Sequence, residues 1–194
     1  MSRWILLRHG RTARNAQRLL DGQGLTPLDY EGRWQAVMAG LRLGGSSPPP
    51  LLLCSDLLRA KQTAAALSAA AGWSATWVFH PALRERHLGR WQGRSYDAVR
   101  RSGRGRQLVG WQDSPPEGES LELLALRLLD FLAPMPDRSG IIVAHAGPLR
   151  VLRGLALGLP LDSIGFQKIP YASPMELTLP QGGWAALSPR LNRS

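Results

Sequence analysis

The sequence predicts an α/β fold, a three-layer sandwich in which helices flank a mostly parallel central sheet. Three short apolar runs, residues 4–7, 51–54 and 141–144, each precede a turn and then a segment with helical periodicity. Repeated strand–turn–helix units of this kind favour a largely parallel sheet. Such sheets bind ligands outside the carboxyl ends of their strands. We therefore expect a functional site among the residues that directly follow the three runs.

The first apolar run, Trp4-Ile5-Leu6-Leu7, stops at Arg8-His9-Gly10. Glycine suits the tight turn that follows a buried strand. Histidine can act as a nucleophile or carry a proton near neutral pH, and the arginine fork of donors matches the oxygens of a phosphate. A purely structural role for His9 is the alternative, which the adjoining Arg8 and Gly10 disfavour.

The second apolar run, residues 51–54, leads into a helix for which Ser55 or Asp56 is a suitable N-cap. Arg59 then lies in the first turn of this helix, at the carboxyl edge of the sheet. An ordinary arginine on the helix surface is the competing interpretation of this residue.

The third run, residues 141–144, ends at His145-Ala146-Gly147 and precedes a helix over 149–157. Because ligand sites form at the carboxyl ends of parallel strands, the residues after all three runs are expected to meet. The sequence therefore predicts one site that contains two histidines and two arginines, namely Arg8, His9, Arg59 and His145.

Hydrophobic periodicity and chain punctuation predict the remaining elements. In chain order we expect a helix over 31–43, a helix continuing through 61–71, a strand over 75–79, a loop-rich excursion over 81–111 with a short helix near 96–101, a helix over 121–132 capped by Ser120, and a hairpin of 175–179 with 184–187. The sequence has no internal repeat and no evident linker. We therefore expect one domain over residues 1–194.

The composition is typical of a globular protein, with 44% hydrophobic and 20% charged residues in 194. The apolar stretches are too short for a membrane span, and the first strand begins too early to leave room for a signal peptide. We expect a cytoplasmic protein without a membrane partner. The single cysteine, Cys54, lies in a predicted buried strand, where a structural thiol is expected rather than a reactive one.

The formal net charge of +10 is the feature that would favour a nucleic-acid partner. The basic residues are scattered, however, except in residues 100–106, and no aromatic residues are interleaved with that run to stack on bases. We therefore expect no nucleic-acid partner. The excess charge would instead steer a small anionic substrate toward its cleft. The sequence carries no signal for an oligomeric state.

Metal binding is also not expected. His80 and His87 are separated by seven positions across a proline, and no cysteine or paired carboxylates accompany them. Zinc ligands usually occur at tighter spacings. We expect a site without a metal ion and without a cofactor.

Five segments of the chain resemble the signature blocks of the histidine phosphatase superfamily, the phosphoglycerate-mutase-like group. They occur in the same order as in the family and extend from the first strand to about Gly158. The blocks are Arg8-His9-Gly10-Arg11-Thr12 with Asn15, residues 55–64 around Arg59, Leu83-Arg84-Glu85 with residues 89–93, Pro116-Glu117-Gly118-Glu119-Ser120, and Val143-Ala144-His145-Ala146-Gly147.

This resemblance implies a phosphomonoester hydrolase that works through a phosphohistidine. His9 would attack the phosphoryl group, and water would then hydrolyse the intermediate. Glu85 would protonate the leaving oxygen and afterwards activate the water, although the segment 84–86 could instead be a solvated charge cluster. The groups expected to bind the phosphoryl oxygens are Arg8, Asn15, Arg59, His145 and the backbone amides around Gly10 and Ala146.

Residues 21–28 are similar to the corresponding loop of alpha-ribazole phosphatases, which act late in cobalamin nucleotide-loop assembly. The stretch 111–119 and the short tail after Tyr171 are similar to that subgroup as well. Two positions depart from the superfamily pattern: Leu25 replaces a frequent acidic residue, and Ala146 replaces a frequent glycine. We expect the substrate pocket to include Gln23, Trp91 and Trp111.

Three other functions compete with the alpha-ribazole phosphatase assignment. A broad-specificity phosphatase of sugar phosphates or nucleotides is the nearest alternative. A phosphoglycerate mutase would share the core, but such enzymes usually resemble longer chains with an added segment. A catalytically silent basic binding module would fit the charge, but the full catalytic set argues against it.

Overall fold

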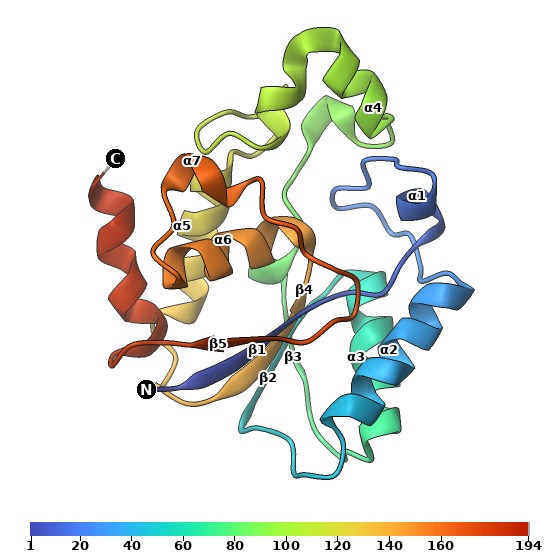
Figure 1. The fold of residues 1–194 in the computed structure, drawn as a ribbon, viewed down its shortest axis with the longest axis vertical. Coiled ribbons are helices and arrows are strands. Elements are labelled where there is room, and N and C mark those ends of the chain that lie inside the picture. Colours follow the sequence, from blue (N-terminus) through green and yellow to red (C-terminus); the bar gives the residue numbers. More distant parts are fainter. Residues whose placement is uncertain (194) are drawn as a thin grey trace.

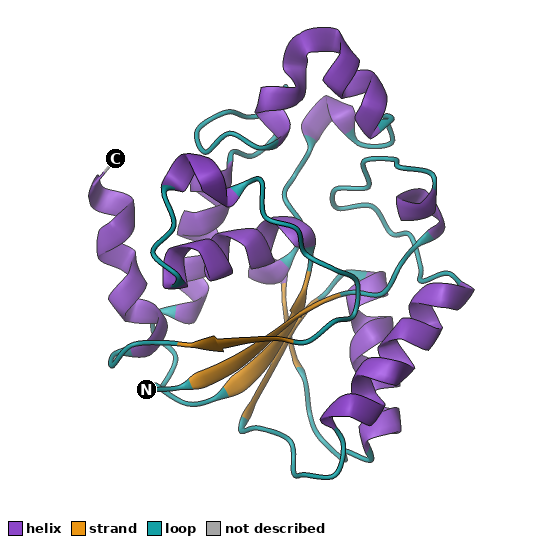
Figure 2. Ribbon diagram, viewed as in Figure 1, coloured by secondary structure: helices purple, strands orange, loops and turns teal. Residues whose placement is uncertain are grey.

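A central sheet of five strands, in the order β3-β2-β4-β1-β5, organises the computed structural model, which describes residues 1–193 and the side chains of residues 1–188 (Figures 1 and 2). The β1, β2, β3 and β4 strands are parallel, and β5 lies antiparallel beside β1. The prediction of a mostly parallel sheet is therefore confirmed. The strands are β1 (Arg3–Arg8), β2 (Leu51–Ser55), β3 (Val78–His80), β4 (Gly140–Ala144) and β5 (Met175–Thr178).

Helices cover both faces of the sheet and produce the predicted three layers (Figure 1). One face carries α2 (Tyr30–Leu43) and α3 (Leu58–Ala71), and the other carries α5 (Leu121–Leu132), α6 (Ala146–Ala156) and the 3-10 helix η5 (Gly183–Arg193). Alternate strand residues enter two different cores. Leu6 and Ile142 pack with α5 and α6, whereas Leu7 and Val143 pack with α3. Because both faces are buried, the strands are continuous apolar runs.

Most predicted helix boundaries agree with the structure. In α2 the side chain of Asp29 accepts a hydrogen bond from the Gly32 amide at 2.7 Å, and in α5 Ser120 accepts one from the Leu123 amide at 3.1 Å. These caps satisfy amides that have no partner within the helix. The α3 helix ends at Gly72, whose φ of 69° is left-handed, a conformation that glycine adopts without a steric penalty.

The predicted cap of α3 is wrong. The helix begins at Leu58, and its N-cap residue, Leu57, makes no side-chain hydrogen bond. Ser55 and Asp56 are engaged in other contacts. The Ser55 hydroxyl accepts from the Leu57 amide and contacts His145, and the Asp56 carboxylate accepts two hydrogen bonds from Arg84.

The expected strand over 75–79 is shorter and displaced, since β3 covers only Val78–His80 and pairs with the end of β2. The Trp77 side chain lies against α3, where its indole donates to the Ser68 hydroxyl at 2.8 Å. Packing against the helix therefore replaces pairing along the first part of the predicted strand.

The predicted C-terminal hairpin is half right. The β5 strand forms, but it pairs with β1, and residues 183–193 form η5 instead of a second strand. Trp184 and Leu187 are three positions apart and are both buried in the core, and Trp184 makes an edge-on ring contact with Trp4 at 5.2 Å. A helix brings such a pair to one face, whereas a strand would separate residues three apart.

Short irregular elements cover the carboxyl edge of the sheet. The expected helix in the 81–111 excursion begins at Tyr96 and continues into a π-helical turn, and further turns flank it. Among the described residues, none of the helices is both long and apolar enough to cross a membrane. The short elements are α1 (Ala13–Ala16), η1 (Pro81–Leu83), η2 (Gly89–Trp91), α4 (Tyr96–Val99), η3 (Arg100–Arg104), η4 (Gly105–Leu108) and α7 (Leu161–Ile164).

Candidate active site

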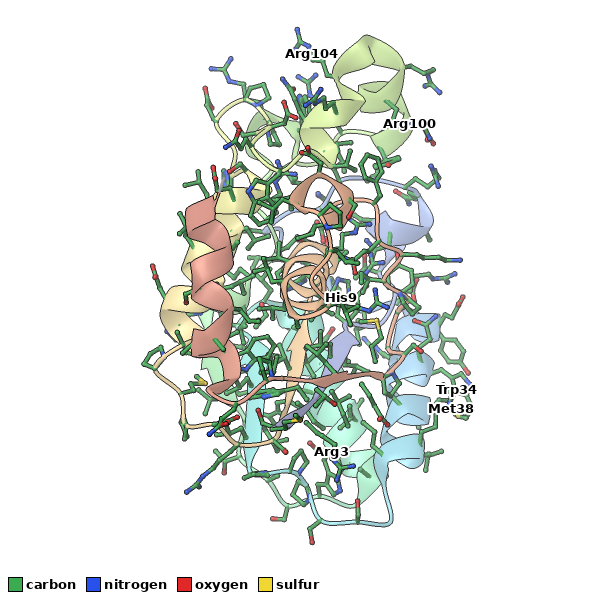
Figure 3. All side chains as sticks on the ribbon, turned by 60° about the vertical axis from the view of Figure 1, so that its left-hand side comes forward. Arg3, His9, Trp34, Met38, Arg100 and Arg104 are labelled. Carbon is green, nitrogen blue, oxygen red and sulfur yellow. The ribbon has the colours of Figure 1, made fainter. Side chains whose placement is uncertain are left out.

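A cavity of about 390 Å³ lies at the carboxyl edge of β1, β2 and β4, beneath the excursion that carries α4. Figure 3 places His9 between the sheet and this excursion, whose outer end carries Arg100 and Arg104. The residues that line the cavity include Arg8, His9, Asn15, Arg59, Glu85 and Ala146. Strands far apart in the sequence therefore bring most of the predicted site residues together.

His9 is held as a neutral imidazole with one unprotonated ring nitrogen. Its Nδ1 lies 2.7 Å from the Gly10 carbonyl oxygen, so Nδ1 carries the proton. Its Nε2 accepts a hydrogen bond from Arg59 Nε at 3.2 Å. Burial, followed by the charges of Arg59 and Arg8, lowers the pKa of His9 well below its usual value. The unprotonated Nε2 can act as a nucleophile when the hydrogen bond from Arg59, which uses its single lone pair, gives way.

Arg59 is almost fully buried, and protein groups occupy most of its donors. Besides His9, its guanidinium donates to the Asp21 carboxylate at 3.2 Å and to two backbone carbonyls, those of Gly22 and Gly24, at 2.7 Å each. Asp21 supplies a buried counter-charge to Arg59. The second Nη2 proton is the donor left for a phosphoryl oxygen.

His145 lies directly beside His9, with the two ring centroids 5.0 Å apart, and is completely buried. Its Nε2 is 2.8 Å from the Ser55 hydroxyl, which already accepts from the Leu57 amide. When the hydroxyl donates its proton to Nε2, the proton of His145 lies on Nδ1. That nitrogen is buried without a hydrogen-bond partner among the described residues. Burial and the neighbouring charges lower the pKa of His145. His145 is not among the described residues that line the cavity.

Arg8 forms a wall of the cavity together with Tyr171. Its guanidinium stacks on the Tyr171 ring, with the carbon 3.9 Å from the centroid, and Nη1 donates to the Ile169 carbonyl at 2.9 Å. Its Nε is buried with no partner in the described residues. A buried donor without a partner costs free energy unless a ligand supplies an acceptor.

Glu85 points into the cavity, so the alternative of a solvated charge cluster is ruled out for this residue. Its Oε1 accepts from the backbone amides of Arg86 at 2.8 Å and Gly147 at 3.0 Å. A Cβ atom at position 147 would come within 2.3 Å of that oxygen, so the contact requires glycine. The carboxylate is thereby fixed at the start of α6.

Asn15 and two backbone amides complete the expected set of phosphate contacts. Asn15 Oδ1 accepts from the Thr12 amide at 3.2 Å, which leaves the side-chain NH₂ for the cavity that Asn15 lines. The Gly10 amide donates to the Thr63 hydroxyl at 3.1 Å and is therefore not free. No described residue accepts from the Ala146 amide, the first of the α6 helix.

The three expected pocket residues do not line this cavity, which corrects the prediction. Trp111 belongs to the core beside α5, and Trp91 is likewise only 3% exposed. Gln23 lies beside a separate hollow and donates through Nε2 to the Glu85 carbonyl at 3.1 Å. Large aromatic side chains gain more from burial in the core than from exposure in a wet cleft.

Sequence reasoning missed four residues that line the cavity, namely Asp21, Arg86, Arg150 and Tyr171, and also Ser55, which contacts His145. Arg86 is buried and donates to four carbonyls in the segment 107–119, and burial lowers the pKa of its guanidinium to about 10. Those carbonyls belong to Gln107, Leu108, Asp113 and Glu119. Nothing in the sequence around Arg84-Glu85-Arg86 distinguishes the buried Arg86 from the half-buried Arg84. Within the described residues, no cluster of three or more His, Cys, Asp or Glu is arranged to hold a metal ion.

The blocks around this cavity match a known family. Residues 4–191 match the model of the histidine phosphatase superfamily, branch 1. The chain belongs to this superfamily. The match extends over nearly all of the chain, well beyond the five sequence blocks, and the resemblance predicted from those blocks is confirmed.

The relatives and solved structures that are similar to this chain are named as different phosphatases. The chain is 38% identical over 176 residues to a glucosyl-3-phosphoglycerate phosphatase of Mycolicibacterium vanbaalenii, covering 83% of this chain and 76% of the relative. A mycobacterial glucosyl-3-phosphoglycerate phosphatase solved with VO3 is similar with a TM-score of 0.80 and 32% identity, over 92% of this chain and 93% of that one. An alpha-ribazole phosphatase from Shigella flexneri is similar with a TM-score of 0.79 and 26% identity, over 93% and 92% of the two chains.

Proposed function

We propose that the chain hydrolyses a small phosphomonoester through a phosphohistidine at His9. Nε2 attacks phosphorus, the N–P bond forms and the P–O bond to the alcohol breaks. Glu85 gives its proton to the departing oxygen. Glu85 then takes a proton from water, which attacks phosphorus and breaks the N–P bond. Inorganic phosphate leaves, and His9 returns to its neutral form.

The state of His9 is the observation that supports this proposal most strongly. Its Nδ1 proton is engaged by the Gly10 carbonyl, and burial lowers its pKa, so Nε2 is unprotonated at neutral pH. This nitrogen lies at an arginine-lined cavity, where the hydrogen bond from Arg59 Nε occupies its lone pair. Phosphoryl transfer depends mainly on positioning and on donors that stabilise the charge of the transition state. Arg8, Asn15, the Ala146 amide and the last free donor of Arg59 supply such donors. His145 Nδ1 adds one more if the phosphoryl group reaches it.

The identity of the alcohol portion of the substrate is proposed from the named relatives and from the loop over 21–28. Glucosyl-3-phosphoglycerate is the first candidate, because relatives with that substrate in their names share up to 38% of their residues with this chain. Alpha-ribazole 5′-phosphate is the second candidate, supported by the loop over 21–28 and by structural neighbours at a TM-score of 0.79. Action in cobalamin assembly and a cytoplasmic location stay predictions.

Phosphate release and trapping of the intermediate test the proposal together. Wild-type protein should release phosphate from p-nitrophenyl phosphate and from at least one candidate, and acid-labile phosphate should appear on the protein in the first turnover. The His9→Asn variant should lose both signals, with a fall in kcat of at least about 10⁴-fold because the nucleophile is absent.

The matched control is His87→Asn, which changes an exposed histidine outside the cavity and should leave both signals in place. Circular dichroism of the two variants checks that they fold equally well. Phosphate release by His9→Asn at the wild-type rate would contradict the proposal.

A further inference from the structure

Five arginines line the cavity, but the protein itself uses most of their donors. Arg86 gives all of its contacts to backbone carbonyls, and Arg59 has one free proton. Arg18 forms a two-pronged ion pair with Asp97 at 2.8 Å on the surface. Arg8, beside His9, belongs to the phosphate site already described. Arg150 is the fifth, and it has no assigned role.

Arg150 is fixed in place, and its outer nitrogens are left free. Its Nε donates to the Gln167 carbonyl at 2.8 Å, and the Gln167 side chain donates back to the Arg150 carbonyl at 2.8 Å. No described residue accepts a hydrogen bond from Nη1 or Nη2. The residue is half-buried and lines the cavity. A preorganised pair of parallel N–H donors of this kind matches a carboxylate.

The position of Arg150 on α6 puts it on the side of Glu85. Residues three and four apart share a helix face, so Arg150 lies one turn beyond Ala146 and Gly147 on the cavity side. The Gly147 amide holds the Glu85 carboxylate. The charge of Glu85 acts on Arg150, and burial lowers the pKa of the Arg150 guanidinium. Because Glu85 serves the departing oxygen, Arg150 faces the alcohol portion of the substrate.

We infer that Arg150 is a specificity-determining residue that binds a carboxylate on the alcohol portion of the substrate. This inference rests on the proposed function. A single carboxylate balances the charge of one arginine, whereas a second phosphate would bring up to two negative charges against that one positive charge. The preferred substrate is therefore a phosphomonoester of a hydroxy acid.

Two substrates that differ only at this group provide the test. In 3-phosphoglycerate a carboxylate occupies the place of the hydroxymethyl group of glycerol 3-phosphate. Wild-type kcat/KM should favour 3-phosphoglycerate by about 10-fold to 100-fold, the range of a charge-assisted hydrogen-bond pair. Arg150→Met should reduce kcat/KM for 3-phosphoglycerate by that factor, mainly through KM, and leave glycerol 3-phosphate within about threefold.

Arg153→Met is the matched control, because it removes the same charge from the same helix. Arg153 also contacts Gln167, through Nη1 and Oε1 at 2.7 Å, but it does not line the cavity. It should retain the wild-type preference. Loss of the preference in both variants, or an equal fall for both substrates in Arg150→Met, would overturn the inference and indicate a structural role.

Binding separates this inference from the proposed function. Dissociation constants of both compounds, measured by calorimetry on the His9→Asn protein with and without Arg150→Met, do not depend on turnover. Binding that depends on the carboxylate and requires Arg150 supports the inference, whether or not the wild-type protein releases phosphate. Absence of phosphate release by the wild-type protein would overturn the proposed function alone. Equal binding of both compounds by the His9→Asn protein overturns the inference.

Discussion

At the scale of single residues, the cavity depends on which hydrogen-bond donors and acceptors are already occupied. Arg59 illustrates this. Its position after β2 predicts a phosphate ligand, yet four of its contacts hold His9, Asp21 and the turn over 22–24. Arg59 therefore holds His9 and the loop over 22–24 in place, and one Nη2 proton is left for the proposed phosphoryl group. The Asp21 carboxylate, only 7% exposed, balances the positive charge of this buried guanidinium.

Acid should destabilise the protein through the same buried histidines. The pKa values of His9 and His145 lie well below 6.5 in the folded protein, so the unfolded chain binds more protons below that pH. The free energy of unfolding should thus be fully retained above about pH 6.5 and fall as pH decreases from there, by up to about 1.4 kcal/mol per unit for each histidine. Urea unfolding between about pH 8 and 5 measures this slope.

The exposed His87 supplies the control for the acid experiment. His87→Asn should retain the wild-type slope, whereas His9→Asn should reduce it, since a group that no longer titrates contributes nothing to the difference between the two states. A wild-type free energy of unfolding that stays constant from pH 6.5 to 5 would contradict the burial of neutral imidazoles.

At the scale of elements, α2 and α3 pack closely because small residues lie between them. A Cβ atom on Gly40 would come within 2.4 Å of the Leu67 carbonyl oxygen and 2.8 Å of the Ala70 side chain. Ala36, Ala39, Ala60 and Ala64 are also fully buried. This close approach brings α3, with Arg59 in its first turn, against the carboxyl end of β2.

Gly40→Ala should therefore destabilise the protein, although alanine favours a helix by about 1 kcal/mol over glycine. Overpacking typically costs about 1–3 kcal/mol, which outweighs that gain when the neighbouring atom is backbone. Thermal and urea unfolding should show the loss. Leu41→Ala, at the next position and 58% exposed, should change the free energy of unfolding by less than about 0.5 kcal/mol. A stabilised Gly40→Ala protein would contradict the packing.

The irregular segment 105–119, beside the cavity, is held in place by hydrogen bonds from a side chain. The segment 105–119 contains little regular structure that could supply donors to its own carbonyls. The buried Arg86 instead donates hydrogen bonds to several of these carbonyls. Gly110 and Pro115 are buried nearby. One side chain thus fixes Leu108, which lines the cavity together with Val109.

At the scale of the whole molecule, a net charge of +10 surrounds a site that binds anions. Positively lined clefts raise association rates of anionic ligands, and salt screens this attraction. For a phosphomonoester we expect kcat/KM to fall by about 10-fold or more between low and high salt, while kcat changes little. Steady-state kinetics in potassium acetate from about 20 to 500 mM would measure the effect.

The excursion supplies the control for charge. Arg100, Arg101 and Arg104 are exposed, and Figure 3 shows Arg100 and Arg104 at the outer end of the molecule, away from His9. Changing all three to glutamine lowers the net charge and should reduce the salt dependence without altering kcat. An unchanged salt dependence would indicate that steering comes from the arginines inside the cavity.

The sequence by itself determined the sheet, most helices, the family and which residues meet at the carboxyl edge. Apolar runs that end at glycine, and caps such as Ser120, act over a few residues, so a local pattern suffices to predict them. The same is true of Arg8, His9, Arg59 and Glu85, because each follows a recognisable block.

Only the tertiary structure decided what each of those side chains can still bind. Trp91 and Trp111 are buried in the interior, and the segment after β5 forms a helix that packs against Trp4. Arg86 donates its hydrogen bonds to carbonyls far away in the sequence. Arg150 kept free donors because only its Nε is engaged, by the Gln167 carbonyl in the segment after α7. Such outcomes depend on contacts between residues far apart in the chain, and no local pattern encodes them.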